Sequence, residues 1–305
     1  MSYSSIKTIC IREHTTVGDS NMIDAFINNP KSPKFHVKKY LDSFGDTLNG
    51  KTVVDVPAGN GVTSALLLEN GAKVEPFDLF PEYFMVKSVE CKRADIAKEI
   101  PLPDAHADMV ICQEGIEHFS DQLKAFKEFN RVLNANGRLL ITTPSYSNLA
   151  AKFSYLLFES ETSKQMPPNE IDDIWMSDKN ISSEIYHGHI FLLGLQKLRI
   201  LGKLAGFRIK EIRYLRLSKG SLLLFPLLYP LIFTSSWIRY FRNLKKRPEL
   251  PKSYKKKVYG EQLKINTNPK NLLNHHIFIV FEKERDSSNV DFRIDSVVKP
   301  FDKIM

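Results

Sequence analysis

The sequence predicts an α/β fold with a mostly parallel sheet, and three observations carry this prediction. Short runs of β-branched residues alternate with segments of helical periodicity, which is the pattern of strand-helix-strand crossover units. The first such run ends in an acidic residue and a glycine turn that leads into a helix. The 305 residues, 43% of them hydrophobic and 26% charged, are enough for one substantial core.

The first half of the chain gives the clearest elements. Asn-Gly pairs at 49–50, 70–71 and 136–137 supply stops between them. We expect, in chain order, a helix at 35–48, a strand at 51–56, a helix from 63 to the stop at 70–71, strands at 74–77 and 109–112, a helix at 122–133 and a strand at 138–142.

The second half is less regular. Its periodicity predicts a helix at 192–205, a strand at 207–215 and a final strand at 276–282. Residues 216–274 are an insertion between the last two strands that the sheet does not need. We therefore divide the chain into an N-terminal arm (1–33), one domain with this insertion (34–285) and a C-terminal tail (286–305).

The segment Asp55-Val-Pro-Ala-Gly59-Asn-Gly61 joins the first strand to its helix. Glycines there let the main chain approach a ligand, and the helix N-terminus supplies hydrogen-bond donors. A nicotinamide dinucleotide fingerprint would prefer glycine at position 64, where this chain has Ser64. The turn therefore favours a cofactor other than a dinucleotide. The alternative is a tight turn that binds no ligand.

Two later positions support a ligand that contains a nucleoside. Asp78 follows the second strand, where a carboxylate can accept hydrogen bonds from both hydroxyls of a ribose. In the pair Asp95-Ile96, the carboxylate can accept an adenine amino proton and the isoleucine can cover the ring. Asp78 alone fits an ordinary surface aspartate equally well, but the order of these features along successive strands makes chance less plausible.

Three further segments, at 110–118, 131–144 and 189–207, carry a family resemblance. Together with the turn at 55–61, they resemble the class I S-adenosylmethionine-dependent methyltransferases, especially the branch with ubiquinone and menaquinone biosynthesis enzymes. The most specific match is Arg131-Val-Leu-Asn-Ala-Asn-Gly137 with the strand after it. The resemblance covers roughly residues 35 to 215, and the final strand completes its pattern.

The resemblance implies a Rossmann-like, seven-stranded sheet whose last strand is antiparallel, with S-adenosylmethionine across the carboxyl ends of the first four strands. By position it implies these cofactor-binding residues: Asp55, Gly59 and Gly61 at the methionine and ribose, Asp78 at the ribose, Asp95 and Ile96 at the adenine, and Gln113 beside the sulfonium. Pro57 stands where the family has its first glycine. Because proline fixes φ and removes a donor, the entry to the turn must differ.

The implied activity is methyl transfer, preferably to an oxygen of a small-molecule or lipid-linked acceptor. Direct displacement requires alignment and a dry pocket rather than a covalent nucleophile. A hydroxyl acceptor also requires a base, for which His118 ranks first, before Glu117, His187 and His189. His118 fits a packing role equally well. Pro57 leaves open a second class, a methyltransferase-like binding protein without activity.

No metal site is predicted, although Glu117 and the three histidines have the chemistry of metal ligands. His187 and His189 are separated by one residue, so on a strand they would point in opposite directions. That geometry argues against a shared metal ion.

The net charge of +8 is concentrated late in the chain. Nine lysines and arginines with one opposing glutamate lie at 239–257, directly after the apolar stretch 222–238. We interpret 222–257 as a segment for an anionic membrane surface, with a lid or a dimer interface as alternatives. As a helix of about 17 residues, the apolar stretch would be too short to span a bilayer, and two prolines interrupt it. A nucleic-acid acceptor would use the basic run but not the apolar one.

The chain is expected to be cytoplasmic, at most peripheral at the inner face of a membrane. Cys10, Cys91 and Cys112 are widely spaced and odd in number, which fits a reducing compartment. The first residues lack the apolar run of a secretory signal.

Overall fold

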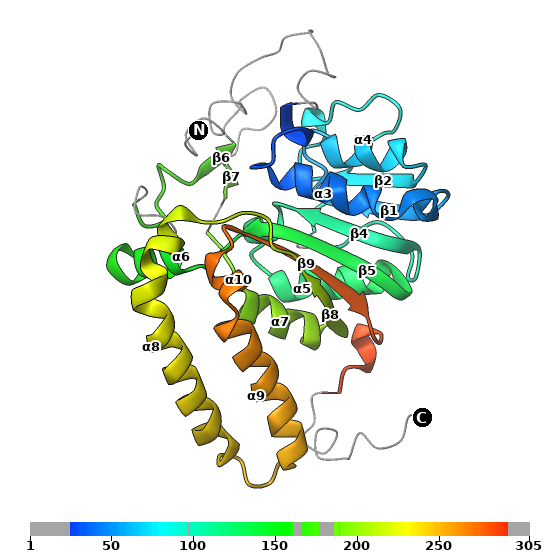
Figure 1. The fold of residues 1–305 in the computed structure, drawn as a ribbon. Helices are drawn as coiled ribbons and strands as arrows, with labels where there is room; N and C mark the ends of the chain where they lie inside the picture. The colour runs from blue at the N-terminus through cyan, green and yellow to red at the C-terminus, as the bar shows by residue number, and fades with distance from the viewer. Residues whose placement is uncertain (1–24, 97, 161–165, 177–185, 189, 292–305) are drawn as a thin grey trace.

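A computed structural model describes residues 25–96, 98–160, 166–176, 186–188 and 190–291 (Figure 1). The strands of its main sheet are β1 (Thr52–Asp55), β2 (Lys73–Asp78), β3 (Lys92–Arg93), β4 (Ala107–Gln113), β5 (Leu133–Pro144), β8 (Phe207–Ile212) and β9 (His276–Lys283). Their order in the sheet is β3-β2-β1-β4-β5-β9-β8. The five strands from β3 to β5 pair in parallel, and β9 is antiparallel to both of its neighbours. The predicted fold class, with its antiparallel last strand, is confirmed.

Helices cover both faces of this sheet. α3 (Pro33–Asp42) and α4 (Val62–Glu69) cover one face, and α5 (Gln122–Val132) and α7 (Leu195–Leu204) cover the other. α6 (Leu149–Phe158) follows β5, and the short 3-10 turns are η1 (Gly45–Leu48), η2 (Pro81–Tyr83), η3 (Ile116–His118) and η4 (Ser287–Asn289). A second sheet pairs β6 (Ile174–Met176) with β7 (Tyr186–His187).

Three predicted elements are shorter in the structure, each for a local reason. The helix expected at 35–48 ends at Asp42 because the left-handed Gly45 (φ 51°) breaks it before η1. The helix expected from 192 begins at Leu195, because Gly194 is extended and Ser147 Oγ accepts the Leu195 N–H. The strand expected to reach 215 ends at Ile212, and Asn274 Oδ1 accepts the main-chain N–H groups of Leu215 and Arg216 beyond it.

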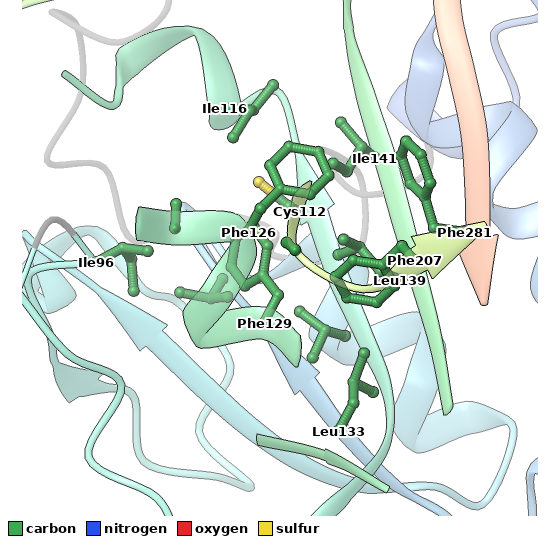
Figure 2. Packing of buried hydrophobic residues seen from close by; sticks show 14 of the residues in the cluster. Ile96, Cys112, Ile116, Phe126, Phe129, Leu133, Leu139, Ile141, Phe207 and Phe281 are labelled. Carbon is green, nitrogen blue, oxygen red and sulfur yellow. The ribbon is translucent and has the colours of Figure 1, made fainter. Parts of the chain in front are cut away.

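The core consists of two clusters, one on each face of the sheet, as alternation along the strands requires. On one face, Phe126 packs edge-on against Phe281 at a centroid distance of 5.5 Å, and Phe129 and Phe207 lie beside them (Figure 2). Met109 and Val110, neighbours on β4, are both buried and lie on opposite faces of the sheet. From the N-terminal arm, Ile27 joins the second cluster, so the end of the arm packs against the domain.

The insertion between β8 and β9 is a helical hairpin of α8 (Lys219–Leu244) and α9 (Lys252–Thr267), followed by the short α10 (Pro269–Leu273). Contrary to the sequence analysis, α8 runs unbroken through Pro226 and Pro230 for 26 residues. Each proline removes one N–H donor, but the carbonyls left over belong to the exposed turns at Leu222 and Pro226, where water reaches them. The helix is therefore about 39 Å long, and by length and composition it could cross a membrane.

Candidate active site

The predicted cofactor residues gather where the parallel strands end. Asp55 is the last residue of β1, Asp78 of β2 and Gln113 of β4. Since these strands are neighbours in the sheet, their carboxyl ends share one edge, which is the usual ligand site of an open α/β sheet. The turn from Asp55 into α4 lies at the same edge.

Asp78 holds the glycine turn in place. Its Oδ2 accepts the main-chain N–H of Gly59 at 2.8 Å, and its Oδ1 accepts that of Phe80 at 2.8 Å. Gly59 (φ 54°) and Gly61 (φ 87°) have the left-handed conformation that favours glycine. Each carboxylate oxygen keeps a further lone pair, so the same group can accept the hydroxyls of a ribose.

Asp55 is buried beneath the turn. Its Oδ2 accepts the hydroxyl of Ser64 at 2.6 Å, while Oδ1 has no hydrogen-bond partner in the described part of the chain. Burial raises the pKa of Asp55 to about 7, and the Ser64 hydrogen bond and the Lys34 charge oppose that rise. Ser64, which argued against a dinucleotide, thus orients the carboxyl group of Asp55.

Gln113 gives a second unsatisfied polar atom at this edge. The Thr63 hydroxyl donates to its Oε1 at 2.5 Å, and its buried Nε2 lacks a partner among the described residues. Buried polar groups in folded proteins are nearly always hydrogen-bonded. One free acceptor on Asp55 and one free donor on Gln113 fit a ligand that, like an amino acid, carries both an ammonium and a carboxylate group. The residues present therefore fit the methionine part of the expected cofactor.

Pro57 is accommodated in the turn by Gly115. The Val56–Pro57 peptide is cis, and the proline ring fills the place where a residue at 115 would carry its side chain. A Cβ on Gly115 would lie 2.2 Å from Pro57 Cδ. The departure from the family pattern at 57 is thus compensated across the sheet edge, a contact that the sequence analysis missed.

We expect Gly115→Ala to lower the free energy of unfolding by about 1–3 kcal/mol, because the added methyl group must displace the Pro57 ring. Gly260→Ala in α9 is the matched control, since a Cβ there meets no atom within 4 Å. Chemical denaturation of both variants checks the prediction. Equal free energies of unfolding for the two variants would show that the Pro57 ring can move aside without loss of stability.

The segment after β2 closes over Gly61. A Cβ at this glycine would lie 2.7 Å from Val86 Cγ2 and 2.8 Å from Phe84 Cε2. By contrast, a Cβ on Gly59 would meet nothing within 4 Å, so open space adjoins that residue. A ligand at the turn therefore has room beside Gly59.

Asp95 and Ile96 follow β3. Asp95 lies 3.3 Å from Lys98 Nζ and is partly exposed. Ile96 is buried in the core cluster that contains Phe126 (Figure 2). Their role at an adenine stays a prediction.

His118 and Glu117 lie on η3, directly after β4, and differ in exposure. Glu117 is fully buried, and its Oε2 accepts the Thr143 hydroxyl at 2.9 Å. His118 is partly exposed; its main-chain oxygen accepts the Tyr186 hydroxyl at 3.2 Å, and the two rings lie 6.4 Å apart. Among the predicted bases, His118 is therefore better placed than Glu117 to meet a substrate.

The structure describes one of the other two histidine candidates. His187 is half-buried on β7, and His189 lies outside the described residues. Within the described ranges, no group of three or more histidines, cysteines and carboxylates is arranged to hold a metal ion.

The structure adds a pair of residues that sequence reasoning did not single out. Glu114 Oε2 lies 2.7 Å from His276 Nε2, and its Oε1 accepts the Thr142 hydroxyl at 2.7 Å. Glu114 has a positive φ of 50°, which a non-glycine residue seldom adopts. The strained loop and the antiparallel register that brings β9 beside β5 create this contact, and neither leaves a local signal in the sequence.

The central part of the chain, which carries the glycine turn, is similar to known methyltransferases. Residues 54–141 match the family model described as "Methyltransferase domain". A probable S-adenosylmethionine-dependent methyltransferase of Mycobacterium tuberculosis is 44% identical over 57 residues, or 19% of this chain and 20% of the relative. A demethylmenaquinone methyltransferase of Beutenbergia cavernae is 29% identical over 126 residues, or 38% of this chain and 51% of the relative.

The similarity is confined to part of each relative, since this chain spans between about a fifth and a half of their lengths. A solved structure of a SAM-dependent methyltransferase from Archaeoglobus fulgidus aligns over 86% of this chain and 98% of its own, at 14% identity and a TM-score of 0.49. The match to the family model begins at Val54 in β1 and ends at Ile141 in β5. It thus includes the glycine turn, Asp78 and the loop after β4. Residues 54–141 therefore match a methyltransferase domain, and the curated relatives similar to this part of the chain include probable S-adenosylmethionine-dependent methyltransferases.

Proposed function

We propose that the protein transfers the methyl group of S-adenosylmethionine to an oxygen atom of a small-molecule or lipid-linked acceptor. The observation that carries this proposal is the sheet edge where Asp78 holds Gly59, beside the unsatisfied buried atoms of Asp55 and Gln113. A turn without a ligand would leave both atoms buried and unpaired, at a cost of about 1–3 kcal/mol each.

In this proposal each residue binds or orients one part of the cofactor, which supplies an activated methyl group when bound. Asp55 and Gln113 hold the methionine end. Asp78 accepts the ribose hydroxyls, and Asp95 with Ile96 holds the adenine. Such alignment can contribute roughly 7–11 kcal/mol to a displacement reaction.

His118 is the proposed base. A hydroxyl acceptor must lose a proton as its oxygen attacks, and a neutral imidazole can take it at physiological pH. Tyr186 supports this role, because its hydrogen bond to the main chain of His118 ties the loop after β4 to β7. The buried Glu117, bonded to Thr143, is proposed to position this loop.

A lipid-linked acceptor is favoured by the exposed apolar residues of α6. This helix starts shortly after the carboxyl end of β5 and exposes Tyr155, Leu156, Leu157 and Phe158. Relatives named as quinone biosynthesis methyltransferases include a C-methyltransferase and an O-methyltransferase. We propose the same branch for this chain, with a cytoplasmic location at the inner face of a membrane.

Labelled methyl groups test the proposal. The protein is incubated with S-adenosylmethionine tritiated at the methyl group and with cell extract separated into membrane and soluble fractions. We expect label in the organic phase of the membrane fraction, and less label with Asp78→Ala when S-adenosylmethionine is kept below saturation. If calorimetry shows cofactor binding but no fraction ever gains label, the protein is the inactive binding protein that Pro57 left open.

In the ligand-free protein, the raised pKa of Asp55 should make the free energy of unfolding depend on pH. A carboxyl whose pKa is raised from 3.8 to about 7 stabilises the fold fully below pH 4, and loses this contribution as the pH rises through 7. The gain in stability from Asp55→Asn should therefore be about 2 kcal/mol larger at pH 8 than at pH 5.5. Denaturant titrations at both pH values measure it, with the exposed Asp46→Asn as control. A gain independent of pH would contradict the raised pKa.

A further inference from the structure

Helix α8 exposes a continuous apolar stripe. Leu223, Leu227 and Leu231 are 83%, 69% and 61% exposed, and Ile238 and Phe241 are 59% and 57% exposed. Steps of three, four and seven residues place all five on one side of a helix. We name these five residues the outer face of α8. An apolar surface of this extent is uncommon on a soluble monomer and marks a site of interaction.

The opposite side of α8 is already occupied by α9. Tyr229 donates its hydroxyl proton to the Thr267 carbonyl at 3.2 Å, and Asn266 donates to Ser236 Oγ at 2.8 Å. The start of α8 is fixed to α6, because Ser221 Oγ accepts the Ala150 N–H and donates to Asn148 Oδ1. The outer face is thus the side that the rest of the described chain leaves uncovered.

Cations surround the far end of this face. Arg242, Lys245, Lys246 and Lys252 are exposed there, whereas Glu249 is paired with Arg247 at 3.2 Å. The buried Lys255 closes the turn by donating to the carbonyls of Lys246 and Arg247 at 3.0 and 3.1 Å. These contacts hold the other cations close together at the turn of the hairpin.

The turn also encloses an open cavity of about 670 Å³. Its apolar lining includes Phe241, Leu244 and Leu250, and its cationic lining includes Lys245 and Lys252. Glu249 also lines the cavity, but its carboxylate is paired with Arg247. Apolar walls with exposed lysines in the lining match an anionic headgroup joined to hydrocarbon. Phe241 belongs to both the cavity and the outer face, so the two surfaces are continuous.

We propose that the hairpin binds the surface of a bilayer that contains anionic lipids. Helix α8 lies in the plane of the membrane, with its outer face among the upper acyl chains and its cations against the headgroups. Each lysine or arginine near an anionic surface strengthens such binding, and exposed leucines add apolar burial. The proposal concerns attachment and does not depend on methyl transfer.

The topology of the sheet favours this in-plane position over a span. β8 and β9 flank the hairpin and are hydrogen-bonded neighbours, so a chain that crossed the membrane in α8 would have to return through α9. α9 begins with Lys252 and carries exposed Lys256 and Lys257 on its next turn. A return through α9 would carry these lysines into or across the membrane, which is costly, and a helix of 16 residues is about 24 Å long, shorter than a bilayer core of about 30 Å. The length of α8 therefore does not make it a transmembrane helix.

Two other occupants of the outer face are less favourable. A second copy of the chain would bring two clusters of cations together, and these clusters would repel each other. A lid would have to reach the sheet edge with the glycine turn, whereas the hairpin extends away from the sheet (Figure 1).

Vesicle flotation at low and high salt tests the proposal with the full chain. We expect the protein to float with phosphatidylcholine vesicles that contain phosphatidylglycerol, less with pure phosphatidylcholine, and less at high salt. The paired change Lys245→Gln and Lys252→Gln should weaken partitioning about thirtyfold. Lys124→Gln with Lys127→Gln, two exposed lysines on α5, removes the same charge elsewhere and should have no such effect.

The outer face is tested by replacing Leu223, Leu227 and Leu231 with serine, which should reduce partitioning more than about a hundredfold. Ile200→Ser on α7 is the control, since Ile200 is an exposed apolar residue away from the hairpin. Circular dichroism and calorimetry with S-adenosylmethionine check that each variant is folded. If the serine variant does not fold, the variant with both lysines replaced still tests the proposal.

Three outcomes would overturn the proposal. The first is wild-type protein that ignores vesicles of both compositions at low salt. The second is a lysine pair that partitions like the wild type, since charge would then not be recognised. The third is a wild-type dimer in light scattering that the serine variant makes monomeric, which would assign the face to a second copy.

Discussion

Asp78→Ala should weaken the binding of S-adenosylmethionine by about 1–3 kcal/mol, or roughly 5- to 150-fold, as isothermal titration calorimetry measures it. The expected loss lies toward the upper end because Asp78 has two tasks. Its carboxylate is the proposed acceptor for the ribose hydroxyls, and it also holds the main chain of Gly59 and Phe80. Without it the glycine turn loses its anchor before any ligand arrives.

Asp108→Ala is the matched control for this change. Asp108 also accepts a main-chain N–H, that of Thr52 at 3.0 Å, but at the opposite end of β1. Both variants should lose some stability, and only Asp78→Ala should lose affinity for the cofactor. Unchanged affinity in folded Asp78→Ala would remove Asp78 from the cofactor site.

Local signals in the sequence were sufficient for most strands of the sheet, but not for β3 or for the order of the strands. The strands at 51–56, 74–77, 109–112 and 138–142 follow from β-branched runs and Asn-Gly stops, and the strand ends then locate Asp55 and Asp78. A strand end is a local feature, and the parallel crossover rule converts it into a shared edge. This is why the principal acidic residues could be found without coordinates.

In the hairpin, a prediction from local sequence was wrong. Pro226 and Pro230 predict a break, because in a helix interior proline usually costs about 3 kcal/mol. In the structure, α8 continues through both, and Tyr229 and Ser236 bond it to α9. Tertiary contacts with α9 therefore offset a local penalty, and no pattern within 222–238 records them.

The remaining site residues depend on contacts between distant segments. Gly115 is required by Pro57, and Gly61 by Phe84 and Val86. Glu114 meets His276 because β9 inserts next to β5 in an antiparallel register. Each of these contacts joins residues far apart in the chain, so composition and periodicity carry no trace of it.

His118→Ala should lower turnover about 10²- to 10⁴-fold once an acceptor has been isolated by the labelling experiment, since a positioned base contributes about that factor. Affinity for S-adenosylmethionine should stay within a few fold, because His118 lies on η3 after β4 and not on the glycine turn. The pH profile supplies a second readout. A base that must be neutral gives an acidic limb in the wild type, and this limb should disappear in the variant.

His187→Ala is the matched control, because it removes a half-buried imidazole from the neighbouring β7. Tyr186→Phe separates the two roles of this loop further. Losing the hydroxyl that bonds the His118 carbonyl should reduce turnover less than losing the imidazole, while the acidic limb persists. If His118→Ala keeps near-normal turnover and His187→Ala does not, the proton acceptor lies on β7, and His118 only packs the loop after β4.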